Sequence, residues 1–469
     1  DTPLKISYTS TTGFSTRQED RYNMMNSQQI LTLERTKGEG AGANGGLPYV
    51  EYVDGQPITI PSTGVPLTDA QIAAYGSTDW NDYFFRTGTT ISHNLGLTSG
   101  SKNVSTYTNF GYFEQEGILI NTDLQRFNFR SNVDGKSNND KFRYGTNISV
   151  NFSKNNSASN LGTGAINQNY VIGAQQSVPY ISPNQYVNGT QVLDLYNADG
   201  TLVYTPLMLV DKSKTFLNNA EEIKAITSFS ASYEIIPGLT LSENLGIDYT
   251  QITGLQYQDP AAFNSLIFQQ AAGQYLGLDA ENFQRDITFD NTLSLDYAKT
   301  FGLNTISATV YTEYVTSFLK SFGFTQNGLD PKTAFPGDDA GFITDVPDND
   351  YYVPTVAANS ANVALLSYFG SVNYDYDGRF GLQGTLRQDA SSRFSDTNKW
   401  GTFYSISGRW NLNRESFMEN AGFQLLKLRA SYGTTGNQDI QNSFYGALNR
   451  SKELYITGVG YGGAPSYVV

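Results

Sequence analysis

The chain has 469 residues, of which 16% are charged and 13% aromatic, and its formal net charge is −14 at pH 7. A nucleic-acid partner would require a basic face, so this charge argues against one. Cysteine is absent and His93 is the single histidine, which excludes disulfides, thiolate metal sites and most histidine-based catalytic or zinc sites.

The chain shows neither a membrane helix nor a leader. No run approaches the roughly 18 apolar residues that a membrane-spanning helix requires. A transmembrane barrel remains compatible with that, because its strands hide their apolar face in alternation. Residues 1–8 have neither the basic start nor the apolar core of a signal peptide, so we expect the numbering to begin inside a longer exported precursor.

Alternation of apolar and polar residues with a period of two predicts strands along most of the chain. In the stretch 285–297, for example, Leu293 and Leu295 share one face, whereas Thr292 and Asp296 share the other. Strands of ten or more residues exceed the roughly five or six of globular sheets and can span a bilayer when tilted. In chain order the predicted strands are 4–14, 89–99, 104–114, 124–134, 141–152, 223–236, 239–253, 285–297, 304–318, 363–376, 379–390, 402–413 and 425–433.

The connections between these strands differ at the two ends of the predicted sheet. Those at 99–101, 134–140, 237–238, 299–303 and 377–378 are short, whereas 15–88, 154–222, 254–282 and 319–362 are long. Outer-membrane barrels have this asymmetry, with short periplasmic turns and long extracellular loops. The pattern therefore predicts an all-β fold, a transmembrane antiparallel up-and-down β-barrel; a large β-sandwich or β-helix is the alternative. Within the long inserts, helices are expected only at 18–34 and at 67–75, where Thr68 begins the helix.

Several residues that could form sites have ordinary structural interpretations. His93 lies on the apolar face of its strand and is expected at the membrane interface. The glycine clusters at 38–46 and 458–463 lack the Lys-Ser/Thr of a phosphate loop and are expected to be loops. Five aspartates in the loop 338–350 could bind a divalent cation, but they lack EF-hand spacing, so a solvated acidic loop is favoured. We expect no catalytic, cofactor-binding or metal-binding residues.

Charged residues on the polar faces of the last strands are the candidate substrate-binding residues. Arg387 and Asp389 share the polar face of 379–390, Arg409 that of 402–413 and Arg429 that of 425–433. These faces would line the barrel interior. Mixed charges there commonly line water or anchor a plug, and direct contact with a substrate is the alternative.

Four stretches resemble the SusC/RagA family of TonB-dependent transporters. They are 79–101, which begins with Asp-Trp-Asn-Asp-Tyr-Phe-Phe-Arg-Thr-Gly; 107–127, which contains YTNFGYFEQEGI; 385–410, TLRQDASSRFSDTNKWGTFYSISGRW; and 427–440, KLRASYGTTGNQDI. The third and fourth are the most specific because order, spacing and composition all match. The resemblance runs from one end of the chain to the other but does not extend to the long loops.

The resemblance implies that residues 1–469 are part of one outer-membrane barrel domain of about 22 strands. The TonB box and the plug domain would precede Asp1, and the last strands would follow Val469. Membership of this family also implies a protein that is not an enzyme, in the bacterial outer membrane, surrounded by its lipid.

The function implied is TonB-dependent import of a large nutrient, an oligosaccharide or a peptide, as the SusC-like subunit of a SusCD-type complex. The partners implied are a SusD-like surface lipoprotein, with the long loops 15–88, 154–222 and 319–362 as its docking surface, and TonB–ExbBD acting through the plug. Two alternatives stay open. One is a passive porin or structural barrel, such as an accessory subunit of a secretion machine. The other is a soluble β-rich glycan-binding protein or enzyme, which would need paired carboxylates in a cleft.

Overall fold

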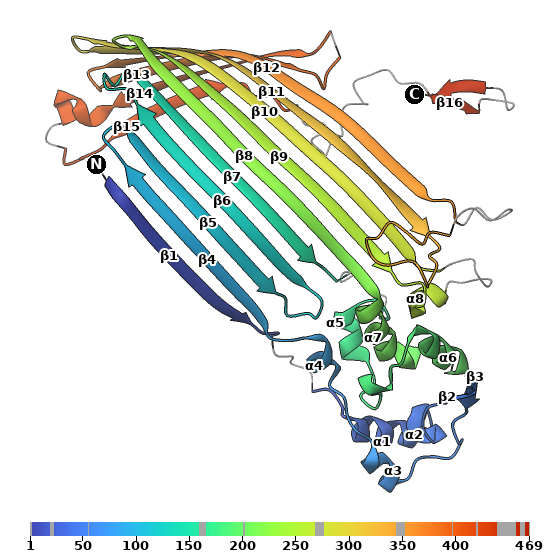
Figure 1. The fold of residues 1–469 in the computed structure, drawn as a ribbon. Helices are drawn as coiled ribbons and strands as arrows, with labels where there is room; N and C mark the ends of the chain where they lie inside the picture. The colour runs from blue at the N-terminus through green and yellow to red at the C-terminus, as the bar shows by residue number, and fades with distance from the viewer. Residues whose placement is uncertain are drawn as a thin grey trace.

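The computed structural model describes residues 2–18, 23–54, 56–158, 166–199, 202–267, 276–343, 352–395, 397–418, 421–438, 456–459 and 465–468. Its main feature is a 13-stranded antiparallel sheet in which each strand pairs with its neighbours along the chain (Figure 1). The strands are β1 (Thr2–Ser15), β4 (Gly88–Gly100), β5 (Val104–Glu116), β6 (Asp123–Lys136), β7 (Phe142–Asn156), β8 (Phe216–Ile236), β9 (Leu239–Gln258), β10 (Leu278–Phe301), β11 (Asn304–Asn327), β12 (Thr355–Tyr376), β13 (Phe380–Ser391), β14 (Trp400–Asn411) and β15 (Lys427–Gly433). All thirteen predicted strands are confirmed, in the predicted order.

Several strands extend beyond their predicted bounds at the end where the long inserts lie, among them β7, which ends at Asn156, and β9, which ends at Gln258. β8 and β10 begin at Phe216 and Leu278, β11 continues to Asn327, and β12 begins at Thr355. In the extension of β8 polar residues occupy both faces, as in its Asn-Asn-Ala-Glu-Glu run, so the apolar alternation that marks a half-buried strand is absent there. On β11, in contrast, Phe322 and Phe324 continue the alternation, and the predicted strand ended too early.

One face of the sheet is apolar and exposed. Leu241, Leu295 and Val310 lie side by side on β9, β10 and β11, and Val310 is 58% exposed. Leu386 on β13 belongs to the same face and is 59% exposed. The other face carries Thr, Ser, Asn and charged residues. This division, apolar outside and polar inside, is that of a barrel wall in lipid.

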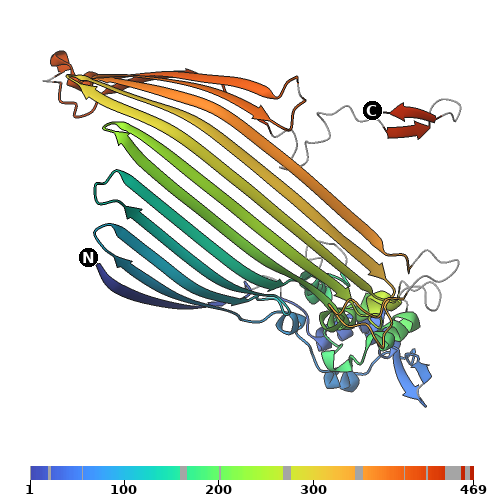
Figure 2. The same cartoon turned by 45° about the horizontal axis from the view of Figure 1, so that its top comes forward.

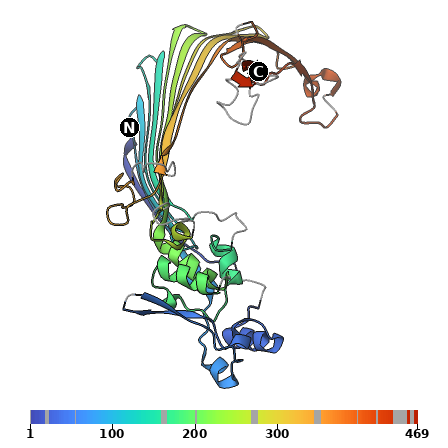
Figure 3. The same cartoon turned by 90° about the vertical axis from the view of Figure 1, so that its right-hand side faces the viewer.

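The sheet curves (Figure 3). Arg387 on β13 reaches Glu313 on β11, and Arg409 on β14 reaches Asp375 on β12, so each contact passes over an intervening strand. Side chains converge on the inner side of a curved sheet, so these contacts identify the polar face as the concave one. β1 and β15 are its two edges, and in the described part of the chain they do not pair with each other, so the wall is open.

Tight turns lie at one end of the sheet and the α-helices at the other (Figure 2). Gly238 (φ +83°) and Gly378 (φ +62°) take the left-handed backbone that such turns require. At the other end, described residues of 23–87, 166–215 and 259–267 pack into one unit, which we call the crown. The crown contains α1 (Ser27–Lys37), α2 (Gly40–Asn44), β2 (Tyr49–Val53), β3 (Gln56–Ile60), α3 (Asp69–Ala74), α4 (Trp80–Phe84), α5 (Tyr170–Gln176), η1 (Pro183–Gln185), α6 (Gly189–Asp199), η2 (Leu202–Tyr204), α7 (Thr205–Thr215) and α8 (Phe263–Leu266).

Only two of these helices were predicted. The 67–75 prediction is confirmed, since α3 is capped by Thr68 in a capping box with Gln71. The 18–34 prediction is wrong in its bounds: α1 starts after Asn26, whose side chain forms a capping box with Gln29, and it ends at Gly38 in the left-handed conformation. Among the described residues no helix has the length and apolar character needed to cross a membrane.

The crown has its own hydrophobic core, built from all three inserts. Leu31, Trp80 and Phe84 come from the first, Met208 from the second and Phe263 from the third, and each is at most 2% exposed. The inserts therefore fold together rather than as separate loops. The remaining elements are η4 (Leu412–Arg414) and η5 (Ser416–Met418) between β14 and β15, and a hairpin of β16 (Ile456–Val459) and β17 (Pro465–Val468).

Candidate functional site

The concave face carries a charged network centred on Arg387. Its guanidinium donates to Glu313 and to Asp389, each at 2.7 Å, and to the Ser367 hydroxyl at 2.9 Å. The same group lies 4.4 Å from the ring centre of Phe369, and Phe369 stacks on Tyr311. A cation, two carboxylates and two aromatic faces thus meet on three adjacent strands, β11, β12 and β13.

A second charged group lies nearer the tight turns. Arg409 and Arg429 are directly opposite each other on β14 and β15, and Arg409 pairs with Asp375. They line a hollow of about 440 Å³ together with Asn373, Gln383, Ser407, Ser431 and neighbouring residues. The hollow is lined by two guanidiniums and one carboxylate, so its lining carries a net positive charge.

The structure therefore places the four predicted residues in two groups rather than one. Arg387 contacts Asp389, and Arg409 faces Arg429. Arg387 is opposite Phe403 and Arg409 is opposite Gly381, so the two arginines are six residues apart along the sheet, or ~20 Å. No single ligand group could bridge both arginines, although a long ligand could pass one after the other.

In the crown, Asp211 is fully buried and joins three segments. It accepts hydrogen bonds from the Tyr186 hydroxyl at 2.9 Å and from the backbone N–H of Phe263 at 2.8 Å. Burial raises the pKa of Asp211 to about 6, against the opposing effect of these hydrogen bonds. The next residue, Lys212, is also buried; burial lowers its pKa to about 8, and its ammonium donates to the Gln168 carbonyl at 3.2 Å. Sequence reasoning missed both residues because they lie in an insert with no strand or helix pattern.

The residues with ordinary interpretations differ in outcome. His93 lies on the outward face of β4, where Nδ1 is 2.8 Å from the Tyr8 hydroxyl. The 38–46 cluster ends α1 and forms α2 rather than a loop. Of the acidic loop, Asp338 and Asp339 are described and Asp345, Asp348 and Asp350 lie outside the described residues. No cluster of three or more acidic or histidine side chains that could hold a metal occurs in the part of the chain that the structure describes.

Two curated proteins are similar to this chain over most of its length. TonB-dependent receptor P3 of Formosa agariphila is 31% identical over 392 residues, which cover 81% of this chain and 36% of that protein. TonB-dependent receptor SusC of Bacteroides thetaiotaomicron is 25% identical over 380 residues, covering 78% of this chain and 36% of SusC. The chain is a homologue of the SusC/RagA-type TonB-dependent receptors. No protein-family model matches it.

Solved structures agree with this assignment at the level of the fold. The RagAB peptide importer in its open-open state superposes with a TM-score of 0.69 at 20% identity, covering 100% of this chain and 50% of that one. Its closed-closed state gives a TM-score of 0.67. The sheet of this SusC/RagA homologue thus has the fold of an outer-membrane β-barrel wall. The chain spans about a third of the length of the curated relatives it matches.

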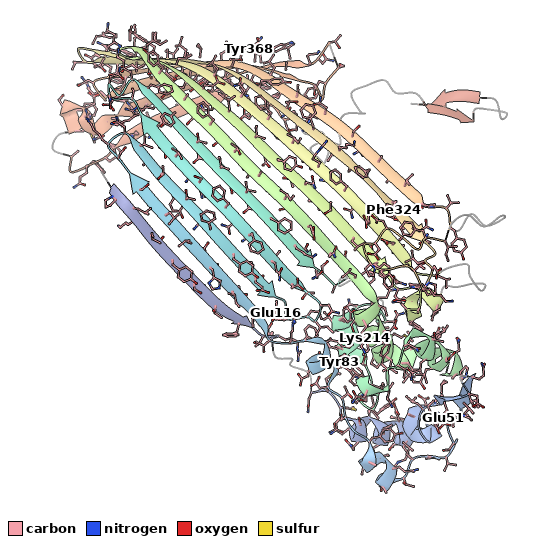
Figure 4. The ribbon with its side chains drawn as sticks, in the orientation of Figure 1. Glu51, Tyr83, Glu116, Lys214, Phe324 and Tyr368 are labelled. Atoms are coloured by element: carbon pink, nitrogen blue, oxygen red, sulfur yellow. The ribbon has the colours of Figure 1, made fainter. Side chains whose placement is uncertain are left out.

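The first family-like motif of this homologue joins the crown to the sheet. Asp79 caps α4, and the Trp80 indole donates to the Val178 carbonyl at 3.0 Å in the second insert. Arg86 donates to the carbonyls of Gly117 and Thr122, at 3.1 and 3.2 Å, in the connection between β5 and β6. Figure 4 shows Tyr83 of this motif and Lys214 of α7 where the crown meets the strands, near Glu116 at the end of β5.

Proposed function

We propose that the protein imports a large nutrient, an oligosaccharide or a peptide, across the bacterial outer membrane in a TonB-dependent manner. The observation that carries this proposal is the concave face, a polar and aromatic wall with charged groups at two depths about 20 Å apart. A wall of that kind offers successive binding positions to a long polar ligand. The RagAB structures, which share the fold, are of a peptide importer.

A third group on the same face suits either kind of ligand. Near the crown, Asn218, Gln256 and Asn282 line a hollow of about 370 Å³ on the inner side of β8, β9 and β10. Carboxamides both donate and accept hydrogen bonds, as the hydroxyls of a sugar and the amides of a peptide require. With Arg387 and Arg409 below, we propose that Asn218, Gln256 and Asn282 make the first contacts with the nutrient.

We further propose two partners for the whole protein. A SusD-like surface lipoprotein would cover the end of the barrel that carries the crown. We leave the connection 319–362 out of most of this docking surface. Its two ends are parts of β11 and β12 in the sheet, and Leu329 and Ala334 pack beside Tyr257 of β9, on the outward face. The crown would therefore provide most of the docking surface. TonB–ExbBD would supply energy through a plug, because a barrel of about 22 strands needs one to prevent leakage.

Uptake by cells that express the full-length protein tests the proposal. We expect accumulation of a labelled oligosaccharide or peptide from the medium to require TonB and to stop when tonB is deleted. The expected gain from TonB is large, because a plugged barrel conducts nothing until its plug moves. Uptake that continues unchanged without TonB, together with steady conductance of the purified full-length protein in planar bilayers, would contradict import and support the passive porin.

A further inference from the structure

The outward apolar band of β10 and β11 ends at a pair of cations. On β10 the outward-facing residues from Ile287 to Tyr297 are apolar except Asn291. Those ten residue steps measure ~33 Å along the strand, or roughly 25 Å across a membrane at the tilt of barrel strands. The band of β11 runs from Ala308 to Phe318, and its outward residues are apolar except Thr312 and Thr316. Arg285 and Lys320 are the next outward-facing residues toward the crown, so both lie at the membrane boundary.

These two cations face each other without an acidic partner. Arg285 and Lys320 are directly opposite in the register, which places their Cβ atoms ~5 Å apart. Both are exposed, and among the described residues neither side chain forms an ion pair. The nearest outward-facing acids are committed elsewhere: Glu221 pairs with Lys154 at 3.0 Å, and Glu281 lies beside Asp339. Like charges at opposite positions destabilise a sheet, so an anion between them would be favoured.

The neighbouring strands extend the pair into a row of hydrogen-bond donors. Gln251 of β9 lies opposite Arg285, and Ser360 of β12 lies opposite Lys320. The Oε1 atom of Gln251 accepts from the Tyr249 hydroxyl at 2.7 Å, which leaves its amide N–H groups for another acceptor. Four donors on four adjacent strands thus lie in one line at the edge of the apolar band.

A pair of aromatic rings lies next to this row of donors, on the side toward the crown. Phe283 and Phe322 are opposite each other one outward position further along, and their rings stack at 4.9 Å. On the other side lie Ile287 and Phe318, at the end of the apolar band. An anion bound here would therefore adjoin the end of the apolar band, where acyl chains would lie, as the headgroup of a lipid does and a free ion in solution does not.

We propose that Arg285 and Lys320, flanked by Gln251 and Ser360, bind the phosphate of a phosphorylated lipid headgroup at the membrane boundary. A guanidinium binds phosphate through two parallel hydrogen bonds, and the ammonium adds a second charge. The apolar band below would receive the acyl chains of the same lipid. This proposal requires the outward face to lie in a membrane, but it is independent of what the protein transports.

Native mass spectrometry of the purified full-length protein tests the proposal, with phosphatidic acid as the probe and diacylglycerol as its phosphate-free match. We expect wild type to retain phosphatidic acid in preference to diacylglycerol. The double variant R285Q/K320Q should weaken retention of phosphatidic acid by about tenfold or more, because two charge-assisted contacts are lost. K299Q is the matched control, since Lys299 is the outward-facing cation at the opposite end of β10 and its neighbour Ile306 is apolar.

Three results would overturn the proposal. Equal retention by wild type and R285Q/K320Q would show that the pair does not bind the lipid. An equal loss in K299Q would show general attraction between cations and anionic lipid. If inorganic phosphate alone displaced phosphatidic acid at concentrations equal to that of the lipid, the site would be one for a free anion. Folding of each variant is checked by its β-sheet circular dichroism and its unfolding midpoint in urea.

Discussion

Arg387 shows how a single residue stabilises a charged inner wall. Its guanidinium forms ion pairs with both Glu313 and Asp389, whose side chains are only 23% and 21% exposed. Two carboxylates held this close by one cation repel each other as soon as that cation is removed. Arg429 offers the opposite case on the same face, because it lies against Arg409 rather than against an acid of its own.

Replacing Arg387 by Gln should therefore destabilise the protein by about 1–3 kcal/mol, the cost of leaving partly buried charges unpaired. The R429Q variant should change stability by less than about 0.5 kcal/mol. Urea unfolding of the full-length protein in vesicles measures both values. Adding E313Q to R387Q should recover part of the loss, because it removes one of the two repelling charges. Equal losses in R387Q and R429Q would show that the network contributes nothing specific.

Asp211 makes the crown sensitive to pH. Its pKa is raised by burial to about 6, above its ordinary value of 3.8. Folding therefore favours the protonated carboxyl, and the contribution is fully present below pH 3.8 and is lost as the pH rises through about 6. A shift of this size corresponds to on the order of 3 kcal/mol. Lys212 does not interfere, because its pKa of about 8 places its own titration at higher pH.

We expect hydrogen exchange at the Tyr186 and Phe263 segments to slow as the pH falls from 7 to 4.5, after correction for the intrinsic pH dependence of exchange. The D211N variant should lose this dependence, because it carries no charge at either pH. The turn at Gly238, far from the crown, is the internal control and should show no such change in either protein. Slower exchange at pH 7 than at pH 4.5 in wild type would contradict the assignment.

At the scale of elements, how well each could be predicted depends on what surrounds it. Strands between lipid and water alternate strictly, and all thirteen could be predicted. α7 could not: all eight residues from Thr205 to Lys212 are buried, so the helix has no polar face and no period to detect. The inward direction of Arg387, Asp389, Arg409 and Arg429 followed from alternation. Their separation into two groups did not, because it depends on register between strands that lie next to each other only in the folded sheet.

The two faces of one hairpin give the element-scale test. Leu295→Arg or Val310→Arg would place a charge in the middle of the outward apolar band, and each should cost about 2–4 kcal/mol. Thr292→Arg and Thr309→Arg point to the inner face, where the Thr309 hydroxyl already donates to Asp296 at 2.7 Å; these variants should cost much less. Equilibrium folding into vesicles of the full-length protein measures all four. Equal penalties on the two faces would contradict the barrel wall.

At the scale of the whole molecule, the ends of the sheet differ in kind. One end has connections of a few residues, whereas the other carries a crown with a core drawn from three inserts. The crown presents exposed apolar side chains of its own, among them Tyr49, Val53 and Ile58 on the hairpin of β2 and β3. Among the described residues this hairpin pairs with no other strand; open edges with apolar surface are expected where a second protein covers a surface. The proposed function requires the crown to face the outside of the cell, where the nutrient and the lipoprotein are.

Epitope tags at two positions of the full-length protein determine this orientation. Asn188 is exposed in the crown just before α6, and Gly238 lies in the tight turn between β8 and β9. On intact cells we expect an antibody to label a tag at Asn188 and not one at Gly238, and both should be labelled after the outer membrane is permeabilised. A tag in the turn at Lys102 is the second protected control. Asp348, a natural choice for a second exposed tag, lies outside the described residues.

The expected contrast arises because a folded barrel holds its turns on one side of the bilayer. Labelling of Gly238 but not Asn188 on intact cells would invert the barrel. The crown would then face the periplasm, where no surface lipoprotein could cover it, and the import proposal would lose its docking surface.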